Sequence, residues 1–140
     1  MKRVSAEKAA REAMDSGLNC CQAVMAAAEE VFKINLGPEA HAMGSLFREG
    51  MGSGCACGAL VGLVMVSGVI ARDHPHPAGA GLPALIQKRF IERFGSSCCR
   101  VIRSKRSPLE KLGNRACKKL TETTAGLMVE LWEGAVGAAE

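Results

Sequence analysis

Cysteine is the residue type in this sequence that offers the most chemistry. Seven cysteines occur in 140 residues, in four separate places along the chain: Cys20, Cys21, Cys55, Cys57, Cys98, Cys99 and Cys117. The odd number fits a complete disulfide framework poorly, and the C-x-x-C spacing of zinc knuckles and thioredoxin-like sites is absent from the sequence. We therefore expect thiol or metal–thiolate chemistry from cysteines that only the fold can bring together.

Adjacent cysteines are poor disulfide partners for each other. Neighbouring Cα atoms lie about 3.8 Å apart, whereas a disulfide usually spans about 4.4–6.8 Å. Successive side chains on a helix also point about 100° apart. The sequence Cys55-Ala56-Cys57, on a loop entering a helix, is freer to bridge or to bind one ligand jointly. In each adjacent pair we expect one member to face a site and the other to pack: Cys20 or Cys21, and Cys98 or Cys99.

Capping and turn residues predict helices throughout the first half of the chain. Ser5 can cap a helix that ends near Gly17, and Asn19 with Gln22 resembles a capping box for a helix beginning at Cys20. Pro38 suits the first turn of a third helix that ends near Phe47. The apolar run 57–71 shows no strand-like alternation and has no second run to pair with, so it predicts a helix.

The second half of the chain follows the same pattern. A loop over 73–83 precedes a helix over 84–94 that Gly95 ends, and Ser96 or Ser97 can cap a short helix carrying residues 98–102. Ser107 and Pro108 begin another turn, and Asn114 can cap a last helix. The sequence therefore predicts a single domain over 1–140, an all-α bundle of six to eight helices. Its Gly-rich central helix is expected to be buried, with Gly58 and Gly62 allowing another helix to pack closely.

The predicted helix starts coincide with cysteines. Cys20, Cys57, Cys98 or Cys99, and Cys117 each fall in a first turn. Partial positive charge and unpaired N–H groups at a helix N-terminus lower a thiol pKa and favour the thiolate. Converging helix starts would thus favour a thiolate cluster. The alternative is that the cysteines simply pack, because a free cysteine behaves as a small hydrophobic residue, and the protein is then a non-catalytic helical interaction module.

Other candidate sites are weaker. His74 and His76 alternate with prolines and can complete a metal site beside a thiolate, although such loops are more often solvated. His41 is expected to be a surface or packed histidine. Gly50, Gly52 and Gly54 do not form a nucleotide-binding G-x-G-x-x-G pattern, and they more simply allow a tight bend.

Composition and charge narrow the class of protein. Hydrophobic residues make up 48% of the chain and the net charge is +4, so a folded domain is expected. The uncharged stretch 50–71 has an apolar part shorter than the about 20 residues of a membrane-spanning helix. The N-terminus lacks the apolar run of a secretory signal, which predicts a cytoplasmic protein with reduced thiols. Seven basic residues against one acidic residue in 88–106 indicate a solvated face or the docking of an acidic electron-transfer partner, not a nucleic-acid site.

The cysteines and their neighbours resemble a redox-active four-cysteine family named for the motif C…CGAxxG…C…C. The central motif is matched by residues 57–62, CGALVG; the first cysteine is matched by Cys20 before Gln22-Ala23-Val24; the third by Cys99, which precedes Arg100; and the last by Cys117. The resemblance spans roughly residues 15–135.

This resemblance implies a redox role for Cys20, Cys57, Cys99 and Cys117, as redox-active thiols or as ligands of an iron–sulfur cluster or another soft metal. Cycling between dithiol and disulfide without a metal is the competing mechanism. Cys21, Cys55 and Cys98 lie outside the pattern. The resemblance is consistent with an oxidoreductase or an electron-transfer component. Such a protein would have a redox partner protein, and it could be monomeric or oligomeric.

Overall fold

Helices make up nearly all of the regular structure in the computed structural model, which describes residues 2–113 and 115–139. They are α1 (Lys2–Asp15), α2 (Cys20–Phe32), α3 (Gly37–Met43), α4 (Gly58–Asp73), the one-turn 3-10 helix η2 (Gly79–Gly81), α5 (Leu82–Phe94), α6 (Cys99–Ser104) and α7 (Arg115–Ala139). A further turn, η1 (Gly50–Gly54), precedes α4. Within the described ranges, strand-like pairing is limited to one isolated antiparallel bridge between Ala56 and Cys98. The predicted all-α bundle is confirmed.

Two helix ends, at the start of α2 and at the end of α5, follow from the predicted capping residues, whereas α6 has Cys98 and not Ser96 or Ser97 at its N-cap position. The Asn19–Gln22 capping box is present at the start of α2, and Gly95 ends α5 in a left-handed conformation with φ 86°. Helix α1 begins before Ser5, and α3 ends at Met43 rather than near Phe47. After α3 the chain continues as a turn, in which the Gly44 carbonyl accepts hydrogen bonds from the Phe47 N–H and from the Asn19 side chain. The cap expected at Asn114 lies outside the described residues.

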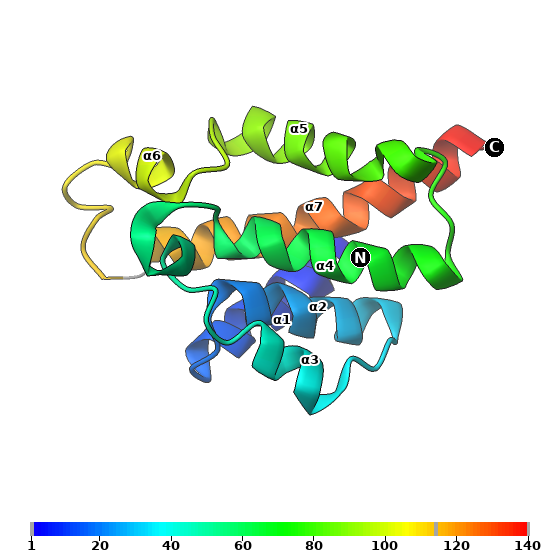
Figure 1. Cartoon of the computed structure of the whole chain (residues 1–140), viewed down its shortest axis with the longest axis horizontal. Coiled ribbons are helices and arrows are strands. Elements are labelled where there is room, and N and C mark those ends of the chain that lie inside the picture. Colours follow the sequence, from blue (N-terminus) through cyan, green and yellow to red (C-terminus); the bar gives the residue numbers. More distant parts are fainter. Residues whose placement is uncertain (1, 114, 140) are drawn as a thin grey trace.

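The long helices lie side by side, with one end of the bundle shared by several helix starts. In Figure 1, α4 runs between α2 on one side and α7 on the other, while α5 covers α7 and runs in the opposite direction to α4. Helices α2, α4 and α7 all begin at the left-hand end of this view, where α6 and η1 also lie. Cysteines that are far apart in the sequence are thereby carried to the same end of the molecule.

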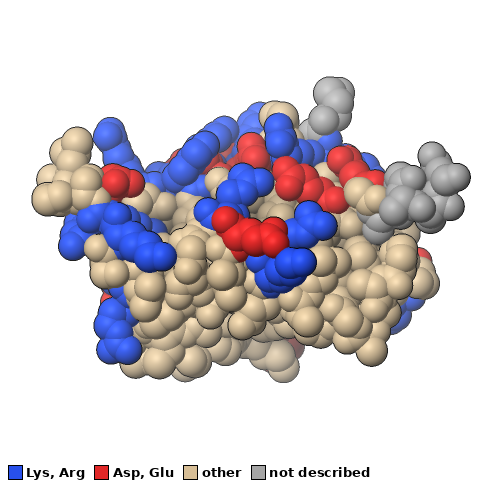
Figure 2. Space-filling model, turned by 90° about the horizontal axis from the view of Figure 1, so that it is seen from above, with Lys and Arg blue, Asp and Glu red and all other residues tan. Residues whose placement is uncertain are grey.

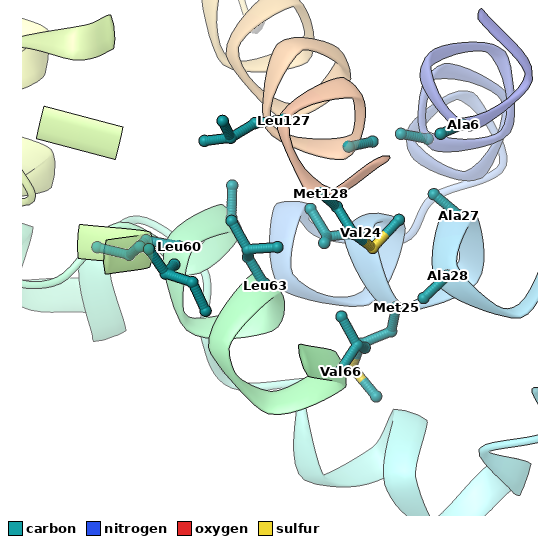
Figure 3. Packing of buried hydrophobic residues seen from close by; sticks show 14 of the residues in the cluster. Ala6, Val24, Met25, Ala27, Ala28, Leu60, Leu63, Val66, Leu127 and Met128 are labelled. Carbon is teal, nitrogen blue, oxygen red and sulfur yellow. The ribbon is translucent and has the colours of Figure 1, made fainter. Parts of the chain in front are cut away.

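The hydrophobic core lies between α1, α2, α4 and α7. Figure 3 shows Met25 of α2, Leu63 and Val66 of α4, and Met128 of α7 pointing toward one another, all of them almost completely buried. Fully buried alanines such as Ala6 let α1 approach α2 and α7 closely. Since methionine and branched aliphatic side chains fill the core, few aromatic residues are needed.

Helix α4 is central and glycine-rich, as predicted, but only one of its sides is buried. A Cβ atom on Gly62 would lie 2.7 Å from the carbonyl oxygen of Cys21, so this glycine permits the close contact between α4 and α2. On the other side, Val64 and Met65 are 40% and 36% exposed. Among the described helices, none has both the length and the apolar character that crossing a membrane would require.

Candidate functional site

The four cysteines of the predicted site line one cavity at the end of the bundle where the helix starts gather. The cavity has a volume of about 300 Å³, and Cys20, Cys57, Cys99 and Cys117 all contribute to its wall. Cys20 and Cys99 are the first residues of α2 and α6, Cys57 is the residue before α4, and Cys117 lies in the first turn of α7. Four chain segments thus each supply one thiol to the same space.

Asn19 fixes the position of Cys20. Its side-chain oxygen accepts a hydrogen bond from the Gln22 N–H at 2.9 Å, and the Gln22 side chain returns a bond to the Asn19 N–H at 3.2 Å. The buried Asn19 amide also donates to the carbonyls of Gly44 and Ser45, each at 3.0 Å. The start of α2 is therefore tied to the chain that follows α3, which restricts the movement of the adjacent Cys20.

Backbone hydrogen bonds join the segment that carries Cys57 to the segment that carries Cys99. The Cys57 N–H donates to the Ser97 carbonyl at 2.9 Å, and the Cys99 N–H donates to the Cys55 carbonyl at 2.6 Å. These two bonds flank the Ala56–Cys98 bridge. Cys57 and Cys99, which follow the two bridged residues along the chain, both line the cavity.

A left-handed turn brings the chain close to Cys99. Residues 49–52 all have positive φ, between 53° and 70°, and two of them, Glu49 and Met51, are not glycine. A Cβ atom on Gly50 would lie 2.6 Å from the Cys55 nitrogen and 2.8 Å from the Cys99 Cβ. Gly50 is therefore required both for its backbone conformation and for this close approach, and the tight bend expected at these glycines is confirmed.

Gly58 allows α4 to begin next to Cys20. A Cβ atom here would lie 2.3 Å from the Phe47 carbonyl oxygen and 3.2 Å from the Cys20 sulfur. The glycine that follows Cys57 thus makes room for the backbone before η1 and for a second cysteine of the cavity.

Cys117 is in contact with arginine. The Arg106 guanidinium donates a hydrogen bond to the Cys117 sulfur at 3.3 Å. Arg103 also lies beside Cys117: its partial burial opposes its charge, but the nearby Cys117 and Cys99 sulfurs raise its pKa above the usual value. An ion pair between Lys118 and Asp15 joins the start of α7 to the end of α1.

Burial governs the protonation of the cavity thiols. It raises the pKa of Cys57 to about 12, against the lowering effect of the nearby Leu60 N–H. Burial also raises the pKa of Cys20, with a further contribution from the charge of Cys117, and it raises the pKa of Cys99 against the opposing charge of Arg103. Backbone N–H groups at the helix starts lower the pKa of Cys20 and Cys57, but the expectation of a net lowering is wrong for all three thiols, because desolvation is the larger effect.

The other three cysteines are directed elsewhere. Cys21 is fully buried in the core, Cys55 is exposed and accepts a hydrogen bond from the Ser53 hydroxyl at 3.2 Å, and Cys98 donates to the Gly54 carbonyl at 3.1 Å. All seven cysteines have free thiols. Within each adjacent pair, it is Cys20 and Cys99 that reach the cavity.

The histidines do not join the cysteines. His74 follows the last residue of α4, and the 16 residues of that helix separate it from Cys57 by about 24 Å. Both ring nitrogens of His76 are in use, since Nε2 lies 3.0 Å from the Leu131 carbonyl oxygen and Nδ1 accepts from the Ala78 N–H. The structure therefore does not place His74 or His76 beside the four cavity cysteines. His41 is packed against Glu29, in agreement with its predicted role.

The cavity wall also contains arginines that were not predicted from the sequence. Arg48, Arg103 and Arg106 line the cavity together with the cysteines. A signal was present, because Arg103 and Arg106 follow Cys99 by four and seven residues, a spacing that keeps side chains on one face where the backbone is helical. Helix α6 itself ends at Ser104, so the position of Arg106 depends on the turn that follows.

The spacing of the thiols limits what they can hold. A single ion bound by thiolates lies about 2.3 Å from each sulfur, and no group of three or more His, Cys, Asp or Glu side chains in the described ranges is placed to hold a metal ion. The cysteines surround a space instead of meeting at a point. This arrangement suits four thiols that surround a larger bound group. It also suits thiols that must move closer together before they can react with one another.

Residues 18–131 match the family described as "putative redox-active protein (C_GCAxxG_C_C)". The chain belongs to this family. The order G-C-A in that description occurs at Gly54–Ala56, but its second glycine would then fall at Ala59, whereas the order C-G-A-x-x-G fits residues 57–62. The structure separates the two registers, because Cys57 lines the cavity and Cys55 is exposed to solvent. No curated protein and no solved structure matches the chain.

Proposed function

We propose that this protein is an electron-transfer component whose cavity cysteines Cys20, Cys57, Cys99 and Cys117 hold an iron–sulfur cluster or a comparable thiolate-bound group of soft metal ions. The observation that carries the proposal is that four thiols from four chain segments line one cavity of about 300 Å³. If the cysteines served only as packing, nothing would require these four to share a cavity while the other three point elsewhere. The redox description of the family supports the same class of function.

The residues present suit such a group. Four cysteine thiolates are the usual ligand set of iron–sulfur clusters, and each ligand binds a separate iron atom where the cluster has four. Ligands of a cluster therefore need not meet at one point, which agrees with the placement of these thiols around a space. A bound cluster would supply one-electron chemistry at a potential that the surrounding charges and hydrogen bonds adjust.

The chain's own residues would perform three tasks in this site. Asn19 and the Ala56–Cys98 bridge hold the cysteines in place before any ligand arrives. Arg103 and Arg106 offset negative charge that gathers on the sulfurs. Burial of Cys57 keeps its thiol protonated until a cation displaces the proton, so that loading of the site releases protons.

Dithiol–disulfide exchange is the second candidate, and one contact favours it. The bond from Arg106 to the Cys117 sulfur stabilises a thiolate, which is the attacking species in exchange. Cys20 and Cys99 are its candidate partners, because both line the same cavity as Cys117. In this mechanism Cys117 and one of these thiols lose two electrons and two protons to an external disulfide, which becomes a dithiol.

Purification without oxygen, followed by reconstitution with iron and sulfide, separates the two candidates. A cluster predicts charge-transfer absorption in the visible range, iron and sulfide bound in stoichiometric amounts, and the loss of both on changing any of the four cavity cysteines to serine. Dithiol exchange predicts no such absorption and the loss of two titratable thiols on mild oxidation. If neither signal appears in protein that is folded by circular dichroism, the redox proposal is wrong and the cysteines serve packing or a partner contact.

A further inference from the structure

The end of the bundle that holds the cysteine cavity carries a strong excess of positive charge. The segment 99–119, which forms α6, the following loop and the start of α7, contains eight lysines and arginines but only one acidic residue, Glu110. In Figure 2, Lys and Arg side chains cover much of the left-hand end of the molecule, where α6 lies in Figure 1. We call the exposed surface of α6, of residues 105–113 and of η1 the basic face.

Some of these basic side chains form no ion pair with another described residue. Arg103 pairs with Glu49 at 4.0 Å, Arg106 bonds to the cavity, and Lys118 pairs with Asp15. By contrast, Arg100 and Lys111 are exposed and form no ion pair with any residue of the described ranges. Unpaired charges of one sign on α6 and the loop after it create a field that extends into solvent and attracts an oppositely charged partner.

Exposed apolar side chains lie among these charges. Leu109 and Leu112 are 78% and 68% exposed on the loop after α6, Met51 is 50% exposed on η1, and Val101 is 38% exposed on α6. Protein–protein interfaces combine buried apolar anchors with a polar, charged rim. The basic face has both features, whereas charge alone would be consistent with a merely solvated surface.

We infer that the basic face is the docking surface for an acidic redox protein, which exchanges electrons with the cysteine site behind it. This inference rests on the proposed function. The partner gives up one electron and is oxidised, the site accepts that electron and is reduced, and no atom is transferred. Leu109 and Leu112 contact apolar residues of the partner, while Arg100 and Lys111 face its carboxylates.

Two other occupants suit this surface less well. A small anion would bind the arginines of the cavity wall, but two of these, Arg103 and Arg106, already contact Glu49 and Cys117. Single-stranded nucleic acid would need exposed aromatic side chains for stacking. The aromatic residues nearby are not free to stack on bases, because Phe90 is buried in the core while Phe47 and Phe94 are partly buried and pack against it.

A plant-type ferredoxin, which is an acidic one-electron carrier, serves as the probe for this surface. We expect it to bind the full-length protein at low ionic strength, with an affinity that falls as salt is added. The double variant Arg100→Glu/Lys111→Glu should raise Kd about tenfold or more, and Leu109→Ser/Leu112→Ser should weaken binding with little change in salt dependence. Lys88→Glu/Arg89→Glu on the exposed side of α5 is the control of equal charge change, and it should change Kd less than about twofold.

Binding and electron transfer are measured separately, so that this inference and the proposed function can fail independently. In reconstituted protein, dithionite should reduce the wild type and the Arg100→Glu/Lys111→Glu variant at equal rates, whereas reduction by ferredoxin should be slowed in the variant. Ferredoxin that fails to bind the wild type, or that binds the variant equally well, would overturn the inference even if the cluster is present. Equal weakening by Lys88→Glu/Arg89→Glu, or tighter salt-dependent binding of a 20-nucleotide single-stranded RNA that Arg100→Glu/Lys111→Glu loses, would also overturn it.

Discussion

The Arg106 guanidinium donates a hydrogen bond to the sulfur of Cys117, at 3.3 Å, inside the cavity that the other three family cysteines line. Arg106 belongs to the turn after α6, and Cys117 belongs to the first turn of α7. The contact therefore links two of the four segments that build the site. It also places a fixed positive charge where negative charge would gather on sulfur.

Removal of this charge should make Cys117 less reactive. In reduced, metal-free protein, Arg106→Gln should slow alkylation of Cys117 by iodoacetamide about tenfold, since a charge-assisted hydrogen bond contributes about 1.5–3 kcal/mol. Arg106→Lys should have a smaller effect. Mass spectrometry of peptides gives the rate for each cysteine, and Arg100→Gln on the exposed side of α6 is the control. An unchanged rate in Arg106→Gln would show that the contact does not stabilise the thiolate.

The cysteines outside the cavity should be dispensable for the site. Cys21 packs in the core and Cys98 bonds to the Gly54 carbonyl. Cys21→Ala and Cys98→Ala should therefore retain the metal or redox signal, whereas Cys20→Ala and Cys99→Ala should lose it. Iron content and visible absorption after reconstitution are the measurements. The opposite result in either pair would mean that the wrong member has been assigned to the site.

Two glycines of α4 should respond to alanine in opposite directions. At Gly58 a methyl group would meet the Phe47 carbonyl oxygen at 2.3 Å, so Gly58→Ala should destabilise the protein by about 1–3 kcal/mol and disturb the site. At Gly68 nothing lies within 4 Å of the same position, so Gly68→Ala should stabilise it by about 0.5–1 kcal/mol through helix propensity. Urea denaturation measures both. Equal effects at the two positions would argue against the close approach at Gly58.

Alkaline pH should destabilise the reduced, metal-free protein. Burial, with a smaller contribution from the charge of Cys20, raises the pKa of Cys21 from its ordinary value near 9 to about 11. The folded protein therefore retains a proton that the unfolded chain loses, so the stabilisation is present below pH 9 and declines as the pH rises through 11.

Urea denaturation between pH 8 and pH 11 tests this dependence. Wild type should lose on the order of 2 kcal/mol more than Cys21→Ala over this range, because the variant has no thiol to titrate at this position. The comparison with Cys21→Ala removes the contribution of lysine titration, which both proteins share. Parallel pH profiles for the two proteins would contradict the raised pKa.

Local sequence determined much of the helical framework. The Asn19–Gln22 capping box and Gly95 are local signals, and the structure confirms the helix boundary that each predicts. Such signals are readable because a cap or a left-handed glycine acts on its own few residues. Local signals were less informative for the chain after α3, where the Gly44 carbonyl accepts a hydrogen bond from Asn19, 25 residues away.

Only the tertiary structure brings the four cysteines to one cavity. The sequence placed Cys20, Cys57 and Cys117 at helix starts, but only the packing of α2, α4 and α7 brings those starts to one end of the bundle. The fold also determines that the Cys57 thiol stays protonated, because burial raises its pKa more than the helix start lowers it. Desolvation depends on all the atoms that surround a group, so no local pattern of residues could have revealed it.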